Sequence, residues 1–325
     1  MMARHPRVSI VIPTYNAEAY VRATLDSVLA QTFEDWELVV FDDGSTDSTV
    51  EVATSVAAVD DRVHVLRDAN EGVAAARNRG FAATDPATEF VIFLDNDDLW
   101  HPDLLATLVA RLDERPAHVS AHAVADSISP DGTRPDGDDL AETLRRRQAL
   151  QGSTVVTLEA SEPTTFAAVG YVNKVLTPGL HLVRRAVFEQ VGGFDPATVP
   201  CDDWDMAVRV SRLGDIGYCD RALLQWRRHG EAQSYRSPAW RKAYFRVRRK
   251  MIADPSNTPE QTRVAQACAR ADGRNILQGG RAAFADHDYV GAVKQVAKAA
   301  NAYASYLAAL ASRAVTRLRP GRTDS

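Results

Sequence analysis

The sequence predicts an α/β protein with a mostly parallel sheet, helices on both faces of that sheet, and a helical C-terminal region. Three observations predict this fold. Short β-branched runs alternate with longer amphipathic runs over the first 125 residues, the strand-like runs are almost continuously apolar, and the last third is compatible with helix. Alternation of this kind is typical of βαβ units, whose parallel strands are buried on both faces.

Strands and helices are expected to alternate along the first part of the chain. The predicted strands are residues 7–13, 37–41, 62–66, 90–94 and 119–125. The predicted helices are residues 18–30, 48–59, 72–83 and 102–114. The next segment, 127–139 (SISPDGTRPDGDD), is rich in proline, glycine and aspartate and is expected to be a surface loop.

The second half of the chain has fewer readable patterns. Segments 178–191 and 203–213 come next, followed by a strand-like run at 223–226. From about Ser237 nearly every residue is compatible with helix, and apolar residues recur at spacings of three and four over 293–310. Such spacing forms an apolar stripe on a helix.

Composition excludes several classes of protein. The 325 residues carry 38 Lys and Arg against 43 Asp and Glu, a net charge of -5, whereas a general nucleic-acid binder is usually basic, so we expect no nucleic-acid partner. The three cysteines have no CxxC spacing, which argues against a disulfide framework and a structural zinc site. The start of the chain lacks a signal-peptide pattern and no apolar run reaches the roughly 18 residues of a membrane span. We expect a cytoplasmic protein that contacts the inner face of a membrane, if at all, from its surface.

Polar residues follow three of the early strands. These runs are PTYN at 13–16, DDGSTD at 42–47 and DNDD at 95–98. Helix capping explains Asp47 and Ser48 equally well, because aspartate and serine are favoured caps. In an open α/β sheet, however, ligands bind outside the carboxyl ends of the strands. Three adjacent strand ends of this kind therefore predict a ligand site.

Asp95 and Asp97 stand two residues apart, directly after an apolar strand. In an extended chain both carboxylates point to the same face and repel each other unless a cation lies between them. Oxygen ligands of this kind suit Mg²⁺ or Mn²⁺. A solvated acidic turn would show the same spacing, so the pair alone does not decide between the two.

A second acidic cluster, Asp202, Asp203 and Asp205, opens a helix-like segment beside Trp204. Acidic residues stabilise helix N-termini, which accounts for part of the cluster. A reaction in which a hydroxyl attacks carbon also needs a carboxylate base within hydrogen-bond reach. His229, which follows two arginines, is either a metal ligand, a phosphate contact or an ordinary structural histidine.

These segments together resemble the family 2 glycosyltransferases, which have the GT-A fold. The motifs, in the family's order, are IPTYN at 12–16, DDGSTD at 42–47, NEGVAAARNRG at 70–80, FLDNDD at 93–98, GGFDP at 192–196 and DDWD at 202–205. The resemblance covers about residues 7–230. It implies a GT-A catalytic domain over residues 1–236, and it has no counterpart for the helical region 237–325.

The resemblance also implies an activity. The enzyme would be an inverting hexosyl- or N-acetylhexosaminyltransferase that moves a sugar from a nucleoside-diphosphate donor to a hydroxyl of a glycan, a lipid-linked sugar or another small acceptor. UDP is the commonest nucleotide of the family, with TDP and GDP left open. The cofactor implied is Mn²⁺ or Mg²⁺.

Site residues follow from the same resemblance, position by position. Those expected at the nucleotide, with Asp43 at the edge of its base, are Thr14, Tyr15, Glu18 and Asp43. Those expected at the donor sugar and phosphates are Arg77, Asn78 and Asp95. Those expected at the metal, with Asp97 in the more direct contact, are Asp97, Asp95 and His229. Asp203 matches the second acid of the family's Glu-Asp pair, the catalytic base, and Asp202 stands where relatives commonly carry glutamate.

The C-terminal third allows two interpretations. Residues 241–250 are strongly basic, and residues 290–318 combine an apolar stripe with basic residues off that stripe. A basic amphipathic helix can lie on an anionic membrane surface. It can also pack on the catalytic domain or on a second copy of the chain in a homodimer, and the many alanines of the stripe favour packing.

Two other functions share this fold. A nucleotidyltransferase-like enzyme would carry a glycine-rich phosphate loop after the first strand, where this chain reads PTYNAEAY. A module that binds nucleotide sugars without catalysis would have lost its acidic residues, yet Asp95, Asp97 and Asp203 are all present. Both observations favour the transferase.

Overall fold

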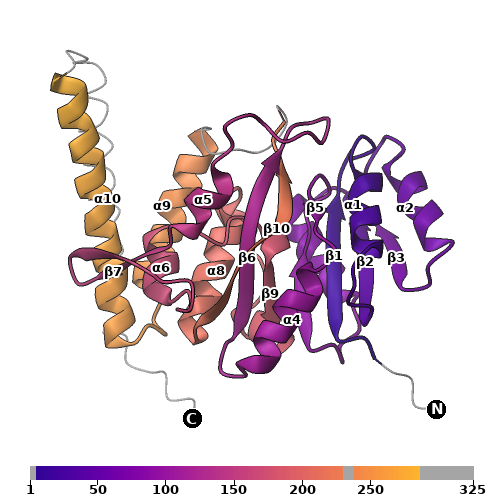
Figure 1. The fold of residues 1–325 in the computed structure, drawn as a ribbon, viewed down its shortest axis with the longest axis horizontal. Coiled ribbons are helices and arrows are strands. Elements are labelled where there is room, and N and C mark those ends of the chain that lie inside the picture. Colours follow the sequence, from indigo (N-terminus) through magenta and orange to yellow (C-terminus); the bar gives the residue numbers. More distant parts are fainter. Residues whose placement is uncertain (1–4, 230–237, 286–325) are drawn as a thin grey trace, which may run out of the picture.

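The computed structural model describes residues 5–229 and 238–285, and its centre is one eight-stranded sheet. The strand order is β3-β2-β1-β4-β9-β6-β10-β5. In Figure 1 the N-terminal strands β1, β2 and β3 lie on the right of the sheet, and β6, β9 and β10 lie to their left. The strands are β1 (Val8–Thr14), β2 (Trp36–Asp42), β3 (Val63–Arg67), β4 (Phe90–Phe93), β5 (Leu99–Trp100), β6 (Ser120–Ile128), β9 (His181–Arg184) and β10 (Ile216–Arg227). Four of its seven strand pairings are parallel, so the predicted mostly parallel sheet is confirmed.

The early helices lie where the apolar periodicity predicts them. They are α1 (Val21–Leu29), α2 (Thr49–Ala57), α3 (Val73–Ala82) and α4 (Leu104–Glu114). Every residue of β1 and β2 is buried, as expected of strands covered on both faces. The continuous apolar runs of the sequence therefore reflect two cores rather than one.

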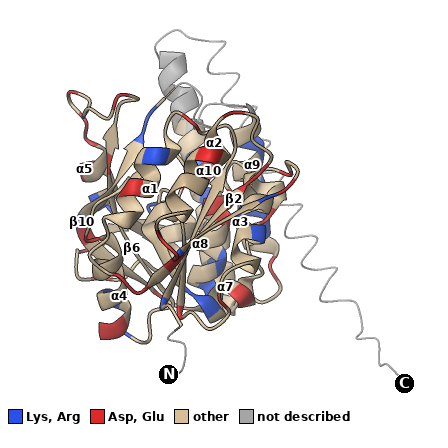
Figure 2. Ribbon diagram, turned by 90° about the vertical axis from the view of Figure 1, so that its right-hand side faces the viewer, with Lys and Arg blue, Asp and Glu red and all other residues tan. Residues whose placement is uncertain are grey.

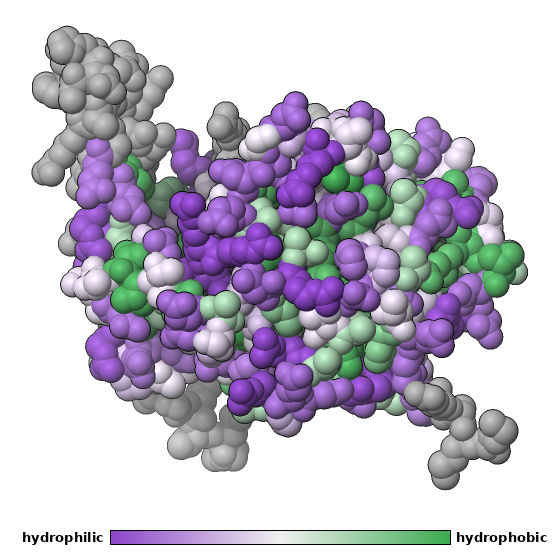
Figure 3. Space-filling view, in the orientation of Figure 1, coloured by the Kyte–Doolittle hydropathy of each residue, from purple (hydrophilic) through white to green (hydrophobic). Residues whose placement is uncertain are grey.

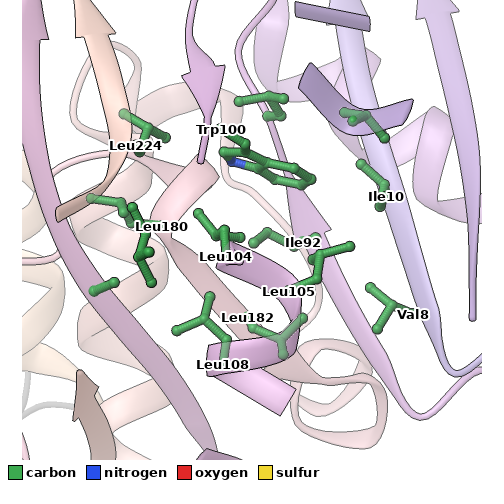
Figure 4. Close-up of a cluster of buried hydrophobic side chains, with 14 of the residues drawn as sticks. Val8, Ile10, Ile92, Trp100, Leu104, Leu105, Leu108, Leu180, Leu182 and Leu224 are labelled. Atoms are coloured by element: carbon green, nitrogen blue, oxygen red, sulfur yellow. The ribbon is translucent and has the colours of Figure 1, made fainter. Parts of the chain in front are cut away.

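Successive residues of β1 enter these two cores. Ile10 belongs to a cluster formed with α1, α2 and α4, whereas Val11 belongs to a second cluster on the opposite face, with α3 and α7 (Arg185–Val191). Leu104 and Leu105 of α4 lie beside Ile92 of β4 in the first cluster (Figure 4). Helices thus cover both faces of the sheet.

Gly80 sets the distance between α3 and the sheet. A Cβ atom at this position would lie 2.5 Å from Cγ1 of Val11 and 3.3 Å from Cβ of Phe41. Only glycine lets the helix approach β1 and β2 this closely. This packing accounts for the glycine that ends the NEGVAAARNRG motif.

The middle of the chain contains more helices and strands than its sequence pattern indicates. Segment 178–191 contains a 3₁₀ turn η1 (Pro178–Leu180), the antiparallel strand β9 and helix α7. The elements that the pattern did not distinguish are α5 (Leu140–Arg145), β7 (Gln148–Gln151), β8 (Thr154–Thr157), α6 (Phe166–Tyr171) and η2 (Pro196–Thr198). The expected surface loop at 127–139 starts at the end of β6 and is mostly exposed beyond it.

The C-terminal region is helical where the structure describes it. Helices α9 (Pro238–Ala253) and α10 (Pro259–Ala285) share a third apolar cluster with α6 and with α8 (Asp202–Leu213). The predicted domain boundary at 236/237, the stripe at 293–310 and the segment 290–318 lie outside the described residues. Within the described part, no helix combines the length and the apolar character that crossing a membrane requires.

The surface of the described part is that of an ordinary folded domain. Polar side chains cover most of the face in Figure 3, interrupted by small apolar areas. Acidic and basic residues are interspersed over the ribbon in Figure 2. Two of the charged residues expected in the site, Arg77 and Asp202, are instead buried.

Candidate functional site

The loops after β1 and β2 are held together by side chains. Thr14 donates from Oγ1 to Oδ1 of Asp42 at 3.1 Å, and Asp42 also accepts the backbone N–H of Ser45 at 2.9 Å. The hydroxyl of Ser45 in turn accepts the backbone N–H of Asn16 at 2.9 Å. Tyr15 stays on the surface, with 50% of its area exposed. The two motif loops thus form one rigid edge, from which Tyr15 is available to a ligand.

Glu18 and Asp47 join the same two loops a little further out. Asp47 accepts the backbone N–H of Glu18 at 3.1 Å, and Glu18 accepts the backbone N–H of Ser48 at 3.0 Å. Asp47 also accepts the N–H of Thr49, the first residue of α2, at 3.0 Å. Asp47 therefore satisfies one N–H at the start of α2, whereas the N-cap residue Ser48 makes no side-chain cap bond. Glu18 is bonded to the start of the same helix.

Asp43 is buried and anchors the loop that leads into α3. Its two carboxylate oxygens accept the backbone N–H groups of Glu71 at 2.9 Å and Gly72 at 2.8 Å. Gly72 has φ +92°, a conformation that glycine adopts without strain. Each oxygen keeps a free lone pair, and a contact from Asp43 to a nucleotide base stays a prediction.

Arg77 connects the end of β4 to the start of α8. From the buried first half of α3, it donates to Oδ1 of Asp95 at 2.5 Å and to Oδ2 of Asp202 at 2.6 Å. Thr177 donates to the other oxygen of Asp95 at 3.3 Å. The structure thus brings Arg77, Asp95 and Asp202 together as one charged cluster.

Asn78 lies on a different side of α3 and holds the GGFDP loop. Its amide N–H donates to the carbonyl of Phe194 at 2.8 Å, and its amide oxygen accepts the N–H of the same residue at 2.8 Å. A Cβ atom at Gly193 would lie 2.6 Å from that amide oxygen. The amide of Asn78 therefore has a structural contact, and its expected donor contact stays a prediction.

Asp97 lies in the loop after β4, and His229 lies just after the end of β10. The two side chains are in contact. His229 Nε2 lies 2.8 Å from Oδ2 of Asp97. Arg227 fixes this approach, because its side chain donates to the carbonyl of Asp97 at 2.8 Å and its backbone N–H donates to Oδ1 of Asp98 at 3.0 Å. Burial, and then the charge of Asp95, raise the pKa of Asp97.

The donor set of this pair fits a divalent cation whose shell is completed from outside the protein. Asp97 supplies a hard oxygen and His229 a nitrogen. Within the described residues, three or more His, Cys, Asp or Glu side chains never gather closely enough to hold a metal alone. Mg²⁺ ions are commonly held by only one or two carboxylates, with water and substrate phosphates completing the shell. A diphosphate ligand would supply such oxygens.

Asp203 lies in the first turn of α8, next to the Arg77 cluster. Asn173 donates to its Oδ2 at 3.1 Å. Burial, and then the neighbouring charge of Asp202, raise the pKa of Asp203 to about 7. Asp205, in contrast, is ion-paired with Arg209 at 2.8 Å. A carboxyl with a pKa of about 7 is suited to act as a general base at neutral pH.

A small pocket, partly open to solvent, adjoins Asp203. Its other lining residues are Phe93, Val175, Thr177, Pro178, His181, Val183, Phe188, Phe194 and Met206. This mainly apolar lining disfavours the charged carboxylate and so contributes to the effect of burial on the pKa of Asp203.

Three residues of the site were not predicted. Asn173 and Thr177 contact Asp203 and Asp95, but they come from a segment without a readable pattern. Arg227 was visible only as part of the run before His229. Their roles depend on contacts between distant parts of the chain.

Comparison with known proteins supports the family resemblance. Residues 9–192 match the family model of glycosyl transferase family 2. The putative teichuronic acid biosynthesis glycosyltransferase TuaG of Bacillus subtilis is 38% identical over 111 residues, which are 34% of this chain and 43% of that one. The matched segments span 16% to 43% of the first three curated relatives.

Solved structures show the same fold. S. aureus TarS 1-349 in complex with UDP-GlcNAc has a TM-score of 0.63 at 20% identity, over 93% of this chain and 81% of that chain. The mannosyltransferase PcManGT from Pyrobaculum calidifontis, in complex with GDP-Man and Mn²⁺, has a TM-score of 0.59 at 23% identity, over 98% and 88%. The expected GT-A fold is thus confirmed. Since the family model covers more than half of the chain, the protein belongs to glycosyl transferase family 2.

Proposed function

We propose that this protein is an inverting, metal-dependent glycosyltransferase that moves a sugar from a nucleoside-diphosphate donor to a hydroxyl of a glycan, a lipid-linked sugar or another small acceptor. The observation that carries the proposal is Asp203, a carboxyl with a pKa of about 7 beside the charged cluster of Arg77, Asp95 and Asp202. Membership of the family supports the same activity.

In the proposed reaction Asp203 accepts the proton of the acceptor hydroxyl. The oxygen of that hydroxyl attacks the anomeric carbon from the face opposite the nucleotide. The bond from this carbon to the diphosphate oxygen breaks, the electron pair leaves with the nucleoside diphosphate, and the configuration inverts. A base with a pKa near the operating pH is suited to this transfer, because it is partly deprotonated and still basic enough to accept the proton.

A cation is proposed because the leaving group, a nucleoside diphosphate, gains negative charge as it departs. Asp97 and His229 are the residues that would hold Mn²⁺ or Mg²⁺, with Asp95 close enough in charge to affect Asp97. When bound, the ion neutralises charge that develops on the departing diphosphate. Arg77 and Thr177 orient Asp95 through hydrogen bonds to its two oxygens. We propose that Asp95 contacts the donor sugar from this position.

The nucleotide is assigned to the edge formed by the β1 and β2 loops. Thr14 and Asp43 are buried in that edge, whereas Tyr15 and Glu18 are exposed on it. Among the solved structures, TarS binds UDP-GlcNAc and PcManGT binds GDP-Man, so both nucleotides belong in a test. We propose a UDP donor, with a hexosyl or N-acetylhexosaminyl group.

A donor panel tests the proposal. Purified protein is incubated with UDP-, GDP- and TDP-sugars, with and without Mn²⁺, and hydrolysis of the donor, in which water takes the place of the acceptor hydroxyl, is measured as release of nucleoside diphosphate. We expect release with one nucleotide class, dependent on the cation and abolished in Asp203→Asn. Asp61→Asn, an exposed residue between α2 and β3, is the matched control and should change nothing.

Two results would contradict the proposal. Nucleotide binding by calorimetry without any release would indicate a binding module instead. Release that is unchanged in Asp203→Asn would show that another group is the base.

A further inference from the structure

The side chain of Trp204, the residue after Asp203 in the sequence, packs against the C-terminal helices. Trp204 stacks on Tyr244 of α9, with ring centroids 4.8 Å apart and an angle of 26° between the rings. Its indole N–H donates to the carbonyl of Val169, in α6, at 2.8 Å. The residue next to the proposed base is therefore fixed by two elements outside the sheet.

A buried ion pair holds this arrangement. Arg248 of α9 is 3% exposed and donates from Nε to Oδ2 of Asp272, in α10, at 2.8 Å. Tyr244 donates its hydroxyl to the other oxygen of Asp272 at 2.8 Å. The guanidinium also lies 5.0 Å from the ring of Trp204, within the range of a cation–π contact. The guanidinium of Arg248 thus contacts both α10 and the ring of Trp204, the residue next to Asp203.

The same arginine also contacts α6, the helix that precedes Asn173, the residue whose amide bonds Asp203. Arg248 donates from a terminal nitrogen to the carbonyl of Gly170 in α6. Gly170 packs so closely that a Cβ atom would lie 2.2 Å from the side chain of Met251 in α9. Asn173, which bonds Asp203 at 3.1 Å, follows this helix by two residues. Both neighbours of the base therefore depend on the position of Arg248.

A second set of ion pairs connects α9 to the sheet domain. Lys250 of α9 contacts Asp205 of α8 and Asp195 of the GGFDP loop, each at 2.7 Å. Asp205 is also paired with Arg209. Helix α8 is thus attached to α9 through Asp205 as well as through Trp204. The C-terminal helices therefore do more than cover an apolar face.

We propose that the Arg248–Asp272 pair, together with Tyr244, positions Asp203 through Trp204 and Asn173, so that the helical region after the sheet domain is part of the catalytic unit. This inference rests on the proposed function. Misplacing a reacting group by about 1 Å can cost on the order of 100-fold in rate. Loss of the pair should therefore affect turnover more than it affects nucleotide binding, because the nucleotide edge lies on β1 and β2.

The test compares turnover with nucleotide affinity in Arg248→Met, with the donor found in the panel above. We expect kcat to fall by at least about 10-fold, while the dissociation constant of the nucleoside diphosphate changes by less than about two-fold, as for a group that acts only in the reaction. Arg248→Lys keeps the charge and should recover part of the lost turnover. Arg249→Met, an exposed neighbour on the same helix, is the matched control and should match the wild type.

A second readout does not need activity. The carboxyl carbon of Asp203 is titrated by ¹³C NMR, with its signal assigned by its absence in Asp203→Asn. In wild type it should titrate near pH 7, and in Arg248→Met at lower pH, because a loosened helix admits water to the carboxyl. Where Arg248→Met does not fold, Tyr244→Phe, which keeps the ring and removes the hydroxyl bond to Asp272, is measured instead.

The outcomes separate this inference from the proposed function. Unchanged kcat and unchanged titration in the folded variants would overturn the positioning role. An equal fall in kcat and nucleotide affinity, with the Asp203 titration unchanged, would overturn it as well, since that pattern indicates general destabilisation. Wild-type protein that releases no nucleotide from any donor would overturn the proposed function, and the titration alone would then decide the role of Arg248.

Discussion

Arg77 donates a 2.6 Å hydrogen bond to Asp202, although 125 positions separate the two residues in the chain. The bond joins α3, which carries the NEGVAAARNRG motif, to the helix that carries the proposed base. Both side chains are almost fully buried. The separate motifs of the sequence are therefore parts of one charged cluster, in which Arg77 bridges the carboxylates of Asp95 and Asp202.

Replacing Arg77 by methionine should destabilise the fold. Removing one partner of a buried ion pair leaves an uncompensated charge, at a cost of about 3–5 kcal/mol. Urea unfolding followed by far-UV circular dichroism measures this loss. Arg22→Met, which breaks an exposed i,i+4 pair with Asp26, is the control and should cost under about 1 kcal/mol. Equal stability of the two variants would contradict a buried bridge.

The rate of transfer should depend on pH through Asp203. The base must be deprotonated to accept a proton, so kcat/KM should rise with pH and level off above about 7, where the carboxyl has lost its proton. The profile is measured with saturating cation in buffers of constant ionic strength. A rate that is flat between pH 5 and 8 would assign the base to a group with an ordinary pKa.

The contribution of Asp203 to the free energy of unfolding should fall as the pH rises, whereas the rate of transfer should increase. The folded-state pKa of Asp203 lies above its ordinary value, so the folded protein binds this proton more tightly than the unfolded chain does. This contribution favours folding at low pH and is lost as the pH rises through about 7. Asp203→Asn should therefore gain stability over wild type at pH 8 and little at pH 4, in thermal unfolding at both values.

Much of this fold was predictable because its first half obeys local rules. Strands β1 and β2 are continuous apolar runs, and α1 and α4 have helical apolar spacing. Strand β9 was missed because four residues are too few to show a period. Strand β5, with only two residues, pairs with β10 from more than 100 positions away.

The site was predictable only in part, for a related reason. Motifs identified Asp95 and Asp203, since their residue types and order are visible in the chain. Their partners were not visible, because Thr177 and Asn173 stand in a segment without periodicity. The contact of Arg77 with Asp202 likewise depends on the packing of α3 against α8, which no local pattern encodes.

Binding of a nucleoside diphosphate should depend on the cation through Asp97. We expect Mn²⁺ to increase the thermal shift produced by UDP or GDP in wild type, and this increase to vanish in Asp97→Ala, because the oxygen ligand is lost. His229→Gln should weaken it. His101→Gln, an exposed histidine after β5, is the control. A cation effect that survives in Asp97→Ala would place the ion elsewhere.

Asn78 should matter for stability rather than for donor binding. Its amide makes two 2.8 Å bonds to the backbone of Phe194, so Asn78→Ala leaves a partly buried N–H and carbonyl without partners, at about 1–3 kcal/mol each for buried groups. Gly193→Ala should act on the same contact, because residue 193 has φ +75° and its new methyl group would lie 2.6 Å from the amide oxygen. The two variants should therefore be less than additive when combined, as expected for neighbours that share one interaction. Chemical denaturation of both single variants and the double variant measures this coupling. If Asn78→Ala instead kept wild-type stability and weakened donor binding, the family-based assignment of Asn78 to the donor would be the better one.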